Sequence, residues 1–535
     1  MMARTFAPLV LSVSGLAALG AMSSCSSSSV SSATGGDAGR DVSTGGRHDA
    51  RTSPEGATPP DATREDAQHL DGGSVDVAPR DASKQDGLSP GGFFVGTGEY
   101  NTFYLLDGSV YGYGANTELE AQGTYSGLCI PPRPIVSPAG VQFAKVQGGL
   151  HQAIALDTKG HVWTWGETDQ GLQGSGTDGG NGAVPFEILT DANGDPFDNL
   201  VEIEATVSGA HGETMYDLAA KSDGTVWAWG NLGGGLLGDG NADGLVSRPT
   251  KTGLTLPAGV TVTKVIGSAA IYVLASDGSV WAWGTDDGNI FGTGVSDAGG
   301  GFTPRKVINL PSNIVDIAMG FGSFQYALTS DGELYGWGYR GGYLGFGSAE
   351  AGSYFPTPTP VSLTNVLNLP EKVVAVACDF ITTHVILADG SLWGWGDDAT
   401  GLVGDGHELD FADASTPYAW NFGTFELPVW KPVRIAPTVS NFKQLFTHSP
   451  FLFYDYALTA DGTLYSWGRN KTGTLGNGVY PLSANGNLGT SSQMAGEYPN
   501  SWDITKPTVV TPFTTQPIGQ NSPECVAHPD AADCH

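Results

Sequence analysis

Short apolar runs alternate with turn residues along most of this chain, and one pattern returns seven times. Each copy has an apolar stretch, a tight turn ending in Gly, and an aromatic-x-aromatic-Gly segment, as from Val273 to Gly284. The copies are YLLDGSVYGYG, ALDTKGHVWTWG, AAKSDGTVWAWG, VLASDGSVWAWG, ALTSDGELYGWG, VILADGSLWGWG and ALTADGTLYSWG. Alternate residues of a strand share one face, so the two aromatic residues of each copy are predicted to pack between neighbouring sheets.

The turns and loops of each copy predict two further strands. Asp-Gly between apolar runs favours a two-residue type I′ hairpin, as at Asp277-Gly278. Gly-rich segments such as Leu236 to Gly240 lack the Lys and the following helix of a phosphate-binding loop, so turns are predicted there. A Pro followed by apolar residues, as in Pro432 to Ile435, favours an edge strand. The predicted order is a Pro strand, a Val-x-x-x-x-Gly strand, an Ala-Leu strand and an aromatic strand.

A period of about 50 to 70 residues that is rich in strand signals indicates a stacked or radial array of small sheets. The pattern W-G-x-x-x-x-G-x-L-G-x-G…P-x-x-V…A-L-x-x-D-G-x-V-x-x-W-G resembles the regulator of chromosome condensation repeat over about residues 93–516. The resemblance implies an all-β, seven-bladed propeller of four-stranded antiparallel blades. We expect the ring to close by pairing of the N- and C-terminal strands, with residues 507–513 joining the blade that begins at Phe93.

The N-terminal residues 1–24 have the features of an export signal, and residues 21–25 resemble a bacterial lipoprotein cleavage box. Lipidation of Cys25 is therefore predicted, and an ordinary signal peptide is the alternative. Residues 25–90 are rich in Ser, Asp, Ala and Gly and are predicted to be a disordered tether between the anchor and a propeller at residues 91–516. These features predict export to the cell envelope, with a lipid anchor in the outer membrane or at the cell surface.

The tail, residues 517–535, contains Cys525 and Cys534 close to His528 and His535. A disulfide between the two cysteines is the prediction for an exported protein, and zinc is the alternative. Cys378, in the apolar run Val373 to Cys378, is predicted to be a buried strand residue.

The chain has 24 Lys and Arg against 55 Asp and Glu, giving a net charge of −31. Nucleic-acid binding requires a basic surface, so no nucleic-acid partner is expected. Nuclear members of the family that this sequence resembles bind chromatin and act as exchange factors for a small GTPase. The acidity and the export signal argue against both roles here.

Two long insertions interrupt the repeat, one between Gly396 and Pro432 and the other between Gly468 and Pro507. Both are aromatic, and aromatic residues outside the repeat suggest a binding patch, although packing of the loops on the blades is the alternative. The candidate binding residues are Phe411, Tyr418, Trp420, Phe422, Trp430, Tyr480, Tyr498 and Trp502.

A third insertion follows Pro185 and contains Asp191, Asn193, Asp195 and Asp198. Alternating carboxylate and amide oxygens suit calcium, but the terminal Glu of the usual calcium loop is missing. The same residues are ordinary hairpin-turn residues, so both interpretations remain.

No nucleophile elbow, zinc-protease helix or Cys/His motif occurs in the sequence, and no cofactor is predicted. We therefore expect a non-catalytic propeller that is anchored to the membrane only through a lipid and recognises a protein partner. A glycan-binding or glycan-processing propeller is the alternative.

Overall fold

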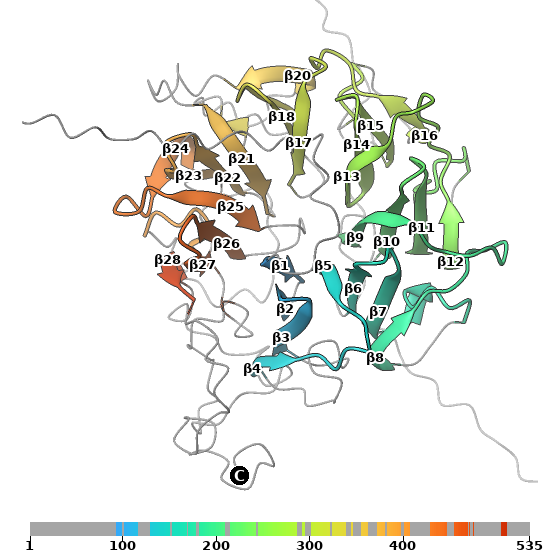
Figure 1. Cartoon of the computed structure of the whole chain (residues 1–535). Coiled ribbons are helices and arrows are strands. Elements are labelled where there is room, and N and C mark those ends of the chain that lie inside the picture. Colours follow the sequence, from blue (N-terminus) through green and yellow to red (C-terminus); the bar gives the residue numbers. More distant parts are fainter. Residues whose placement is uncertain are drawn as a thin grey trace, which may run out of the picture. The chain divides into compact units, whose positions relative to one another are not determined.

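The computed structural model describes most of the repeat region and consists of seven four-stranded antiparallel sheets in a ring (Figure 1). The predicted seven-bladed β-propeller is confirmed. Beside the strands there is a short 3-10 helix at Asp169–Gly171, and no described helix is long and apolar enough to cross a membrane. The described residues are 93–98, 101–115, 129–149, 152–167, 169–177, 181–208, 214–241, 244–285, 291–294, 301–320, 324–338, 344–345, 355–361, 372–379, 382–396, 401–406, 429–446, 454–468, 470, 475 and 504–510.

The four strands of each blade follow one another in the chain and in space. The first strands lie around the centre of the ring and are β1 (Phe94–Thr97), β5 (Phe143–Gly148), β9 (Leu200–Ser208), β13 (Val262–Gly267), β17 (Ile314–Met319), β21 (Val373–Cys378) and β25 (Phe442–Phe446). The second strands are β2 (Asn101–Leu106), β6 (Gln152–Asp157), β10 (Thr214–Lys221), β14 (Ala270–Ala275), β18 (Phe324–Thr329), β22 (Thr382–Leu387) and β26 (Tyr454–Thr459).

The third strands carry the aromatic pairs, and the fourth strands carry the prolines. The third strands are β3 (Ser109–Ala115), β7 (Val162–Glu167), β11 (Val226–Asn231), β15 (Val280–Gly284), β19 (Leu334–Gly338), β23 (Leu392–Gly396) and β27 (Leu464–Gly468). The fourth strands are β4 (Cys129–Pro134), β8 (Asn181–Glu187), β12 (Leu245–Lys251), β16 (Gly301–Lys306), β20 (Phe355–Val361), β24 (Val429–Ile435) and β28 (Ile504–Val509).

The edge position predicted for the proline strands is confirmed, because each one pairs only with the aromatic strand of its own blade. In every blade the register shifts in this pairing, as between Ala228 and Gly230, which lie opposite Thr250 and Val246. Pro249 lies inside that shift. A proline lacks the N–H that a ladder needs, so a bulge on an edge strand is where it costs least.

The predicted closure of the ring is wrong. Strand β28 pairs with β27 of the last blade, with Tyr465 opposite Val509 and Ser466 opposite Thr508. The first blade is already complete, because β4 supplies its fourth strand. The proline strand ends a blade and does not begin one, so the chain has neither a missing strand at its start nor a surplus strand at its end.

Side chains, not a shared sheet, join the first and last blades. The Tyr454 hydroxyl lies 2.9 Å from the carbonyl oxygen of Asn101 and accepts a hydrogen bond from Thr102 at 3.1 Å. The Tyr113 hydroxyl donates to Tyr104 at 2.6 Å and also contacts the hydroxyl of Tyr456. These buried hydroxyls satisfy one another across the seam, as buried polar groups must.

The turns between the second and third strands differ from the prediction in six blades. Only in the first blade do both turn residues have positive φ, 50° at Asp107 and 77° at Gly108, as a type I′ turn requires. In the third blade the pairing of Lys221 with Thr225 leaves a three-residue loop, in which Gly224 has φ 86°. This is the longer hairpin with a glycine bulge, and it allows the side chain of Asp223 to accept a hydrogen bond from the Thr225 backbone N–H at 2.9 Å.

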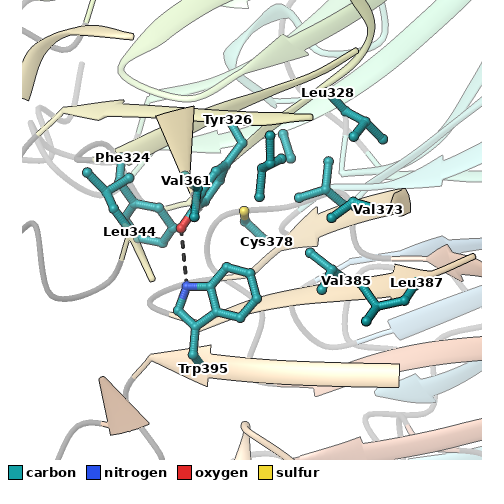
Figure 2. Packing of buried hydrophobic residues seen from close by; sticks show 13 residues of the cluster. Phe324, Tyr326, Leu328, Leu344, Val361, Val373, Cys378, Val385, Leu387 and Trp395 are labelled. Atoms are coloured by element: carbon teal, nitrogen blue, oxygen red, sulfur yellow. Dashed lines mark hydrogen bonds between the residues drawn. The ribbon is translucent and has the colours of Figure 1, made fainter. Parts of the chain in front are cut away.

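The aromatic pairs pack between blades, as predicted. The second aromatic residue of each pair is almost completely buried, and these residues are Tyr113, Trp165, Trp229, Trp283, Trp337, Trp395 and Trp467. Figure 2 shows one such interface, in which the Trp395 indole N–H donates to the Tyr326 hydroxyl of the preceding blade at 3.3 Å. Cys378 is buried in the same cluster, in agreement with its predicted position.

Candidate functional site

The two long insertions start from neighbouring blades, and both start on the same face of the ring. The first connects β23, which ends at Gly396, to β24, and the second connects β27, which ends at Gly468, to β28. Both join a third strand to a fourth strand, so their direction is the same. The two blades pack directly on each other through a cluster that includes Ile386, Ile435 and Trp467. The two insertions therefore start from adjacent blades.

Most of the predicted binding residues lie outside the described residues. These are Phe411, Tyr418, Trp420 and Phe422 of the first insertion and Tyr480, Tyr498 and Trp502 of the second. Trp430 lies in β24, where the structure describes its backbone only. The binding patch stays a prediction, and so do the lipidation of Cys25 and the disulfide between Cys525 and Cys534, which also lie outside the described residues.

The first insertion starts from the same anchored turn that the shorter connections use. In the fourth blade the Trp283 indole donates to the carbonyl oxygen of Leu236 in the preceding blade at 2.8 Å. In the seventh blade Trp467 donates in the same way to Leu402 at 3.0 Å. A Cβ at Gly404, where φ is 79°, would lie 3.0 Å from the Trp467 ring. The Gly-rich segments therefore form turns that receive the next blade's Trp, which supports the turn interpretation.

The calcium candidate forms a hydrogen-bonded turn between β8 and β9. The Asp191 carboxylate is buried and accepts hydrogen bonds from the backbone N–H groups of Asn193 at 2.8 Å and Asp195 at 3.1 Å. Phe197 follows this turn and packs against Trp227 and Trp229. These contacts are those of the turn interpretation, and calcium binding stays an untested alternative. This turn lies at the end of the blades opposite to the two long insertions.

A buried polar cluster between the sixth and seventh blades was not found from the sequence. His384 in β22 has its Nδ1 atom 3.2 Å from a carboxylate oxygen of Asp455 in β26, and both side chains are almost fully buried. Asp379, directly after β21, offers a third ligand atom within 4.8 Å of the other two. The signal was a departure from the repeat, because the strand position of His384 holds Leu218 or Tyr326 in other blades.

Charged residues of the first strands form ion pairs between adjacent blades near the centre of the ring. Lys145 of β5 pairs with Glu202 of β9, and Lys264 of β13 pairs with Asp316 of β17 at 2.7 Å. These four residues occupy the same strand position in successive blades, so their charges alternate in sign. Each pair is partly exposed, and it joins two blades that share no sheet.

Two residues further along β9, the carboxyl group of Glu204 is almost completely buried. The Gln147 amide donates to it at 3.3 Å, and its second oxygen has no hydrogen-bond partner among the described residues. Burial raises the pKa of Glu204 from 4.5 to about 8, although the Lys145 ammonium opposes the shift. Glu204 is therefore neutral at pH 7 in the folded protein.

No family model matches the chain. The human E3 ubiquitin-protein ligase HERC2 is 29% identical over 321 residues, which cover 58% of this chain and 6% of HERC2. The mitochondrial RCC1 domain-containing protein RUG3 of Arabidopsis thaliana is 31% identical over 258 residues, covering 46% of this chain and 52% of RUG3. The chain thus spans about half of RUG3 and a small part of HERC2.

The fold is also that of yeast RCC1 (Prp20), whose structure in complex with Kap60 superposes with a TM-score of 0.55 and 20% sequence identity. That likeness covers 85% of this chain and 92% of Prp20. The chain is similar in sequence to the RCC1 domain-containing protein RUG3 and has the fold of yeast RCC1. The predicted resemblance is confirmed by these relatives, and an RCC1-type propeller explains both the blade order and the aromatic packing described above.

Proposed function

We propose that this protein is a non-catalytic RCC1-type propeller that binds a protein partner through the two insertions of its sixth and seventh blades. The observation that carries the proposal is that residues 407–428 and 476–503 each connect a third strand to a fourth strand in neighbouring blades, so both start on one face, and the first starts from an anchored turn. Relatives of the fold act on proteins: Prp20p of Saccharomyces cerevisiae has binding properties toward Gsp1p and histones, and yeast RCC1 (Prp20) is found with Kap60 bound. The propeller itself would serve as a rigid support.

The geometry offers a direct test because one blade supplies a short replacement loop. The turn Leu402-Val403-Gly404-Asp405-Gly406 matches Leu236-Leu237-Gly238-Asp239-Gly240, after which only residues 241–244 lead to β12. Replacing residues 407–428 by Asn-Ala-Asp-Gly should therefore leave the blade intact. We expect the melting temperature to stay within about 3 °C of wild type and partner capture to fall more than about tenfold.

The measurement is capture of proteins from the cell envelope, identification of the captured protein, and its binding in purified form to both chains. A control is Lys159→Glu, which changes an exposed turn residue on the opposite face and should leave capture unchanged. Equal capture by the shortened variant would overturn the proposed binding face. Capture of glycans instead of protein, lost in the same variant, would favour the glycan alternative. A large fall in melting temperature would assign the insertions to the blade core.

We further propose that the protein is exported and held in the cell envelope by lipid on Cys25, with residues 25–90 as the tether. The features that support this are the apolar N-terminal segment and the small residues before Cys25. A lipid-modified Cys25 would bind the membrane stably, because several acyl chains bind far more strongly than one. Cys25→Ala is expected to move most of the protein from the membrane fraction to the soluble fraction. Unchanged membrane binding of this variant in fractionation would contradict the anchor.

A further inference from the structure

The imidazole of His384 is held in a fixed orientation at the interface of the sixth and seventh blades. Its Nε2 atom lies 3.3 Å from the carbonyl oxygen of Val403, and its ring packs edge-on against Trp467 at 5.2 Å between centroids. A Cβ at Gly394 would lie 2.8 Å from the ring, so only a glycine leaves room for it on that side. The ring cannot turn without breaking these contacts.

The contact with Val403 determines which ring nitrogen carries a proton. A carbonyl oxygen only accepts hydrogen bonds, so Nε2 must donate, and Nδ1 of the neutral imidazole then presents a lone pair. This Nδ1 atom is buried, lies 3.2 Å from a carboxylate oxygen of Asp455, and has no hydrogen-bond partner among the described residues. A lone pair facing a carboxylate is repulsive unless something positive lies between them.

We propose that Asp379, His384 and Asp455 bind a divalent first-row transition metal ion, with zinc as its representative, that links the sixth and seventh blades. The two carboxylates also have other interactions in the protein, so the argument rests on the imidazole and on the convergence of the three ligand atoms. Metal-binding histidines commonly donate their second ring N–H to a carbonyl or carboxylate, which is the role of Val403 here.

The distances fit such an ion. Metal–nitrogen and metal–oxygen bonds of about 2.1 Å, with the two ligand atoms 3.2 Å apart, give an angle of about 100° at the metal. The Asp379 oxygen lies within 4.8 Å of both, so a small adjustment brings it into the same sphere. One imidazole and two carboxylates favour zinc, manganese or iron over calcium and magnesium, which prefer oxygen ligands only.

The position of the ion would give it a structural role. All three ligands are buried, and they come from two blades that share no sheet. Val403 belongs to the turn from which the first long insertion starts, so the ion would stabilise the part of the ring that carries both insertions. This inference does not depend on the proposed protein partner.

The test measures the metal content and the melting temperature of the full-length protein. Wild type grown with zinc should retain about one metal ion per chain after dialysis, and a chelator should lower its melting temperature by about 3–5 °C, reversibly on adding zinc. His384→Gln should retain less than about a tenth of that metal and should not respond to the chelator. Asp379→Asn, at the end of a strand, gives the same readout if His384→Gln does not fold.

Asp217→Asn is the matched control, because Asp217 occupies in β10 the position that Asp455 occupies in β26. Asp217 accepts a hydrogen bond from Gln152 at 2.7 Å and belongs to no group of three metal-ligating side chains among the described residues, so this variant should retain the metal. Wild type without bound metal and indifferent to zinc would overturn the proposal and leave the contact between His384 and Asp455 as a direct one. If folded His384→Gln retained the metal, the metal site would lie elsewhere in the protein. If wild type bound calcium as well as it binds zinc, the assignment to a first-row transition metal would be wrong.

Discussion

Trp283→Ala is expected to lower the free energy of unfolding by about 3–5 kcal/mol, the largest loss we expect from a single substitution in this propeller. The indole is completely buried between the third and fourth blades, in a cluster with Tyr216, Leu218 and Leu236. Truncation creates a cavity there and also leaves the carbonyl oxygen of Leu236 without the indole donor at 2.8 Å. Urea unfolding followed by circular dichroism would measure the loss.

Trp281, two residues earlier on β15, is the matched control. It is only partly buried at the edge of the same cluster, and its indole donates to the Ser279 hydroxyl at 3.0 Å. Trp281→Ala should therefore cost only about 1–2 kcal/mol, because less surface is lost and the hydroxyl can turn to water. Equal losses for the two variants would contradict the assignment of the second aromatic residue to the interface between blades.

The aromatic packing could be predicted from sequence because it is local and repeated. Residues 281 and 283 share one face of a strand whatever the neighbouring sheet is, and seven copies of the pattern make the blade count plain. The proline strand could also be assigned to an edge, because the missing N–H at Pro249 decides this without tertiary context.

The closure of the ring could not be predicted by the same reasoning. A repeated pattern of four strands has no marked beginning, so the proline strand can be counted as the first strand of one blade or the last of the one before. Only the pairing of β28 with β27 distinguishes the two. The turn type was also ambiguous, because Asp-Gly serves both a two-residue loop, at Asp107-Gly108, and a three-residue loop, at Asp223-Gly224.

The His384 cluster escaped sequence analysis for a different reason. Its three residues are separated by up to 76 positions, from Asp379 to Asp455, and no spacing rule connects them. They meet because His384 and Asp455 lie on facing sides of adjacent blades, which requires the register of β22 and β26. A comparison of equivalent strand positions would have marked His384, where the other blades have Phe, Ile, Leu or Tyr.

Glu204 shows the same limit, since the sequence alternates Glu202 and Glu204 with apolar residues and suggests that both face water. The structure separates them: Glu202 pairs with Lys145 and is partly exposed, whereas Glu204 is 1% exposed. A buried carboxyl group with one amide donor stays protonated, because burial disfavours the charged form. Two identical residues on one strand therefore lie in different surroundings.

Glu204→Gln is expected to stabilise the protein by about 3 kcal/mol at pH 7 and to have little effect near pH 4. The pKa of Glu204 is about 8 in the folded protein and 4.5 as a free side chain. Between these values the unfolded chain releases a proton that the folded chain keeps, so ionisation favours unfolding and stability falls as pH rises. The contribution of Glu204 to the free energy of unfolding is thus fully present below about pH 4.5, and it is lost as the pH rises toward 8.

The glutamine variant removes this loss, because its amide has nearly the shape of a protonated carboxyl group and does not ionise. Its oxygen can still accept the hydrogen bond from Gln147 that Glu204 accepts at 3.3 Å. Urea unfolding of both proteins from pH 4 to pH 8.5 should show a difference that grows steadily with pH. Glu202→Gln, on the same strand, should lower stability slightly by breaking the pair with Lys145 and should show no such growth. A difference between Glu204→Gln and wild type that stays constant across this range would show that Glu204 ionises normally, and so that it is not buried between the blades.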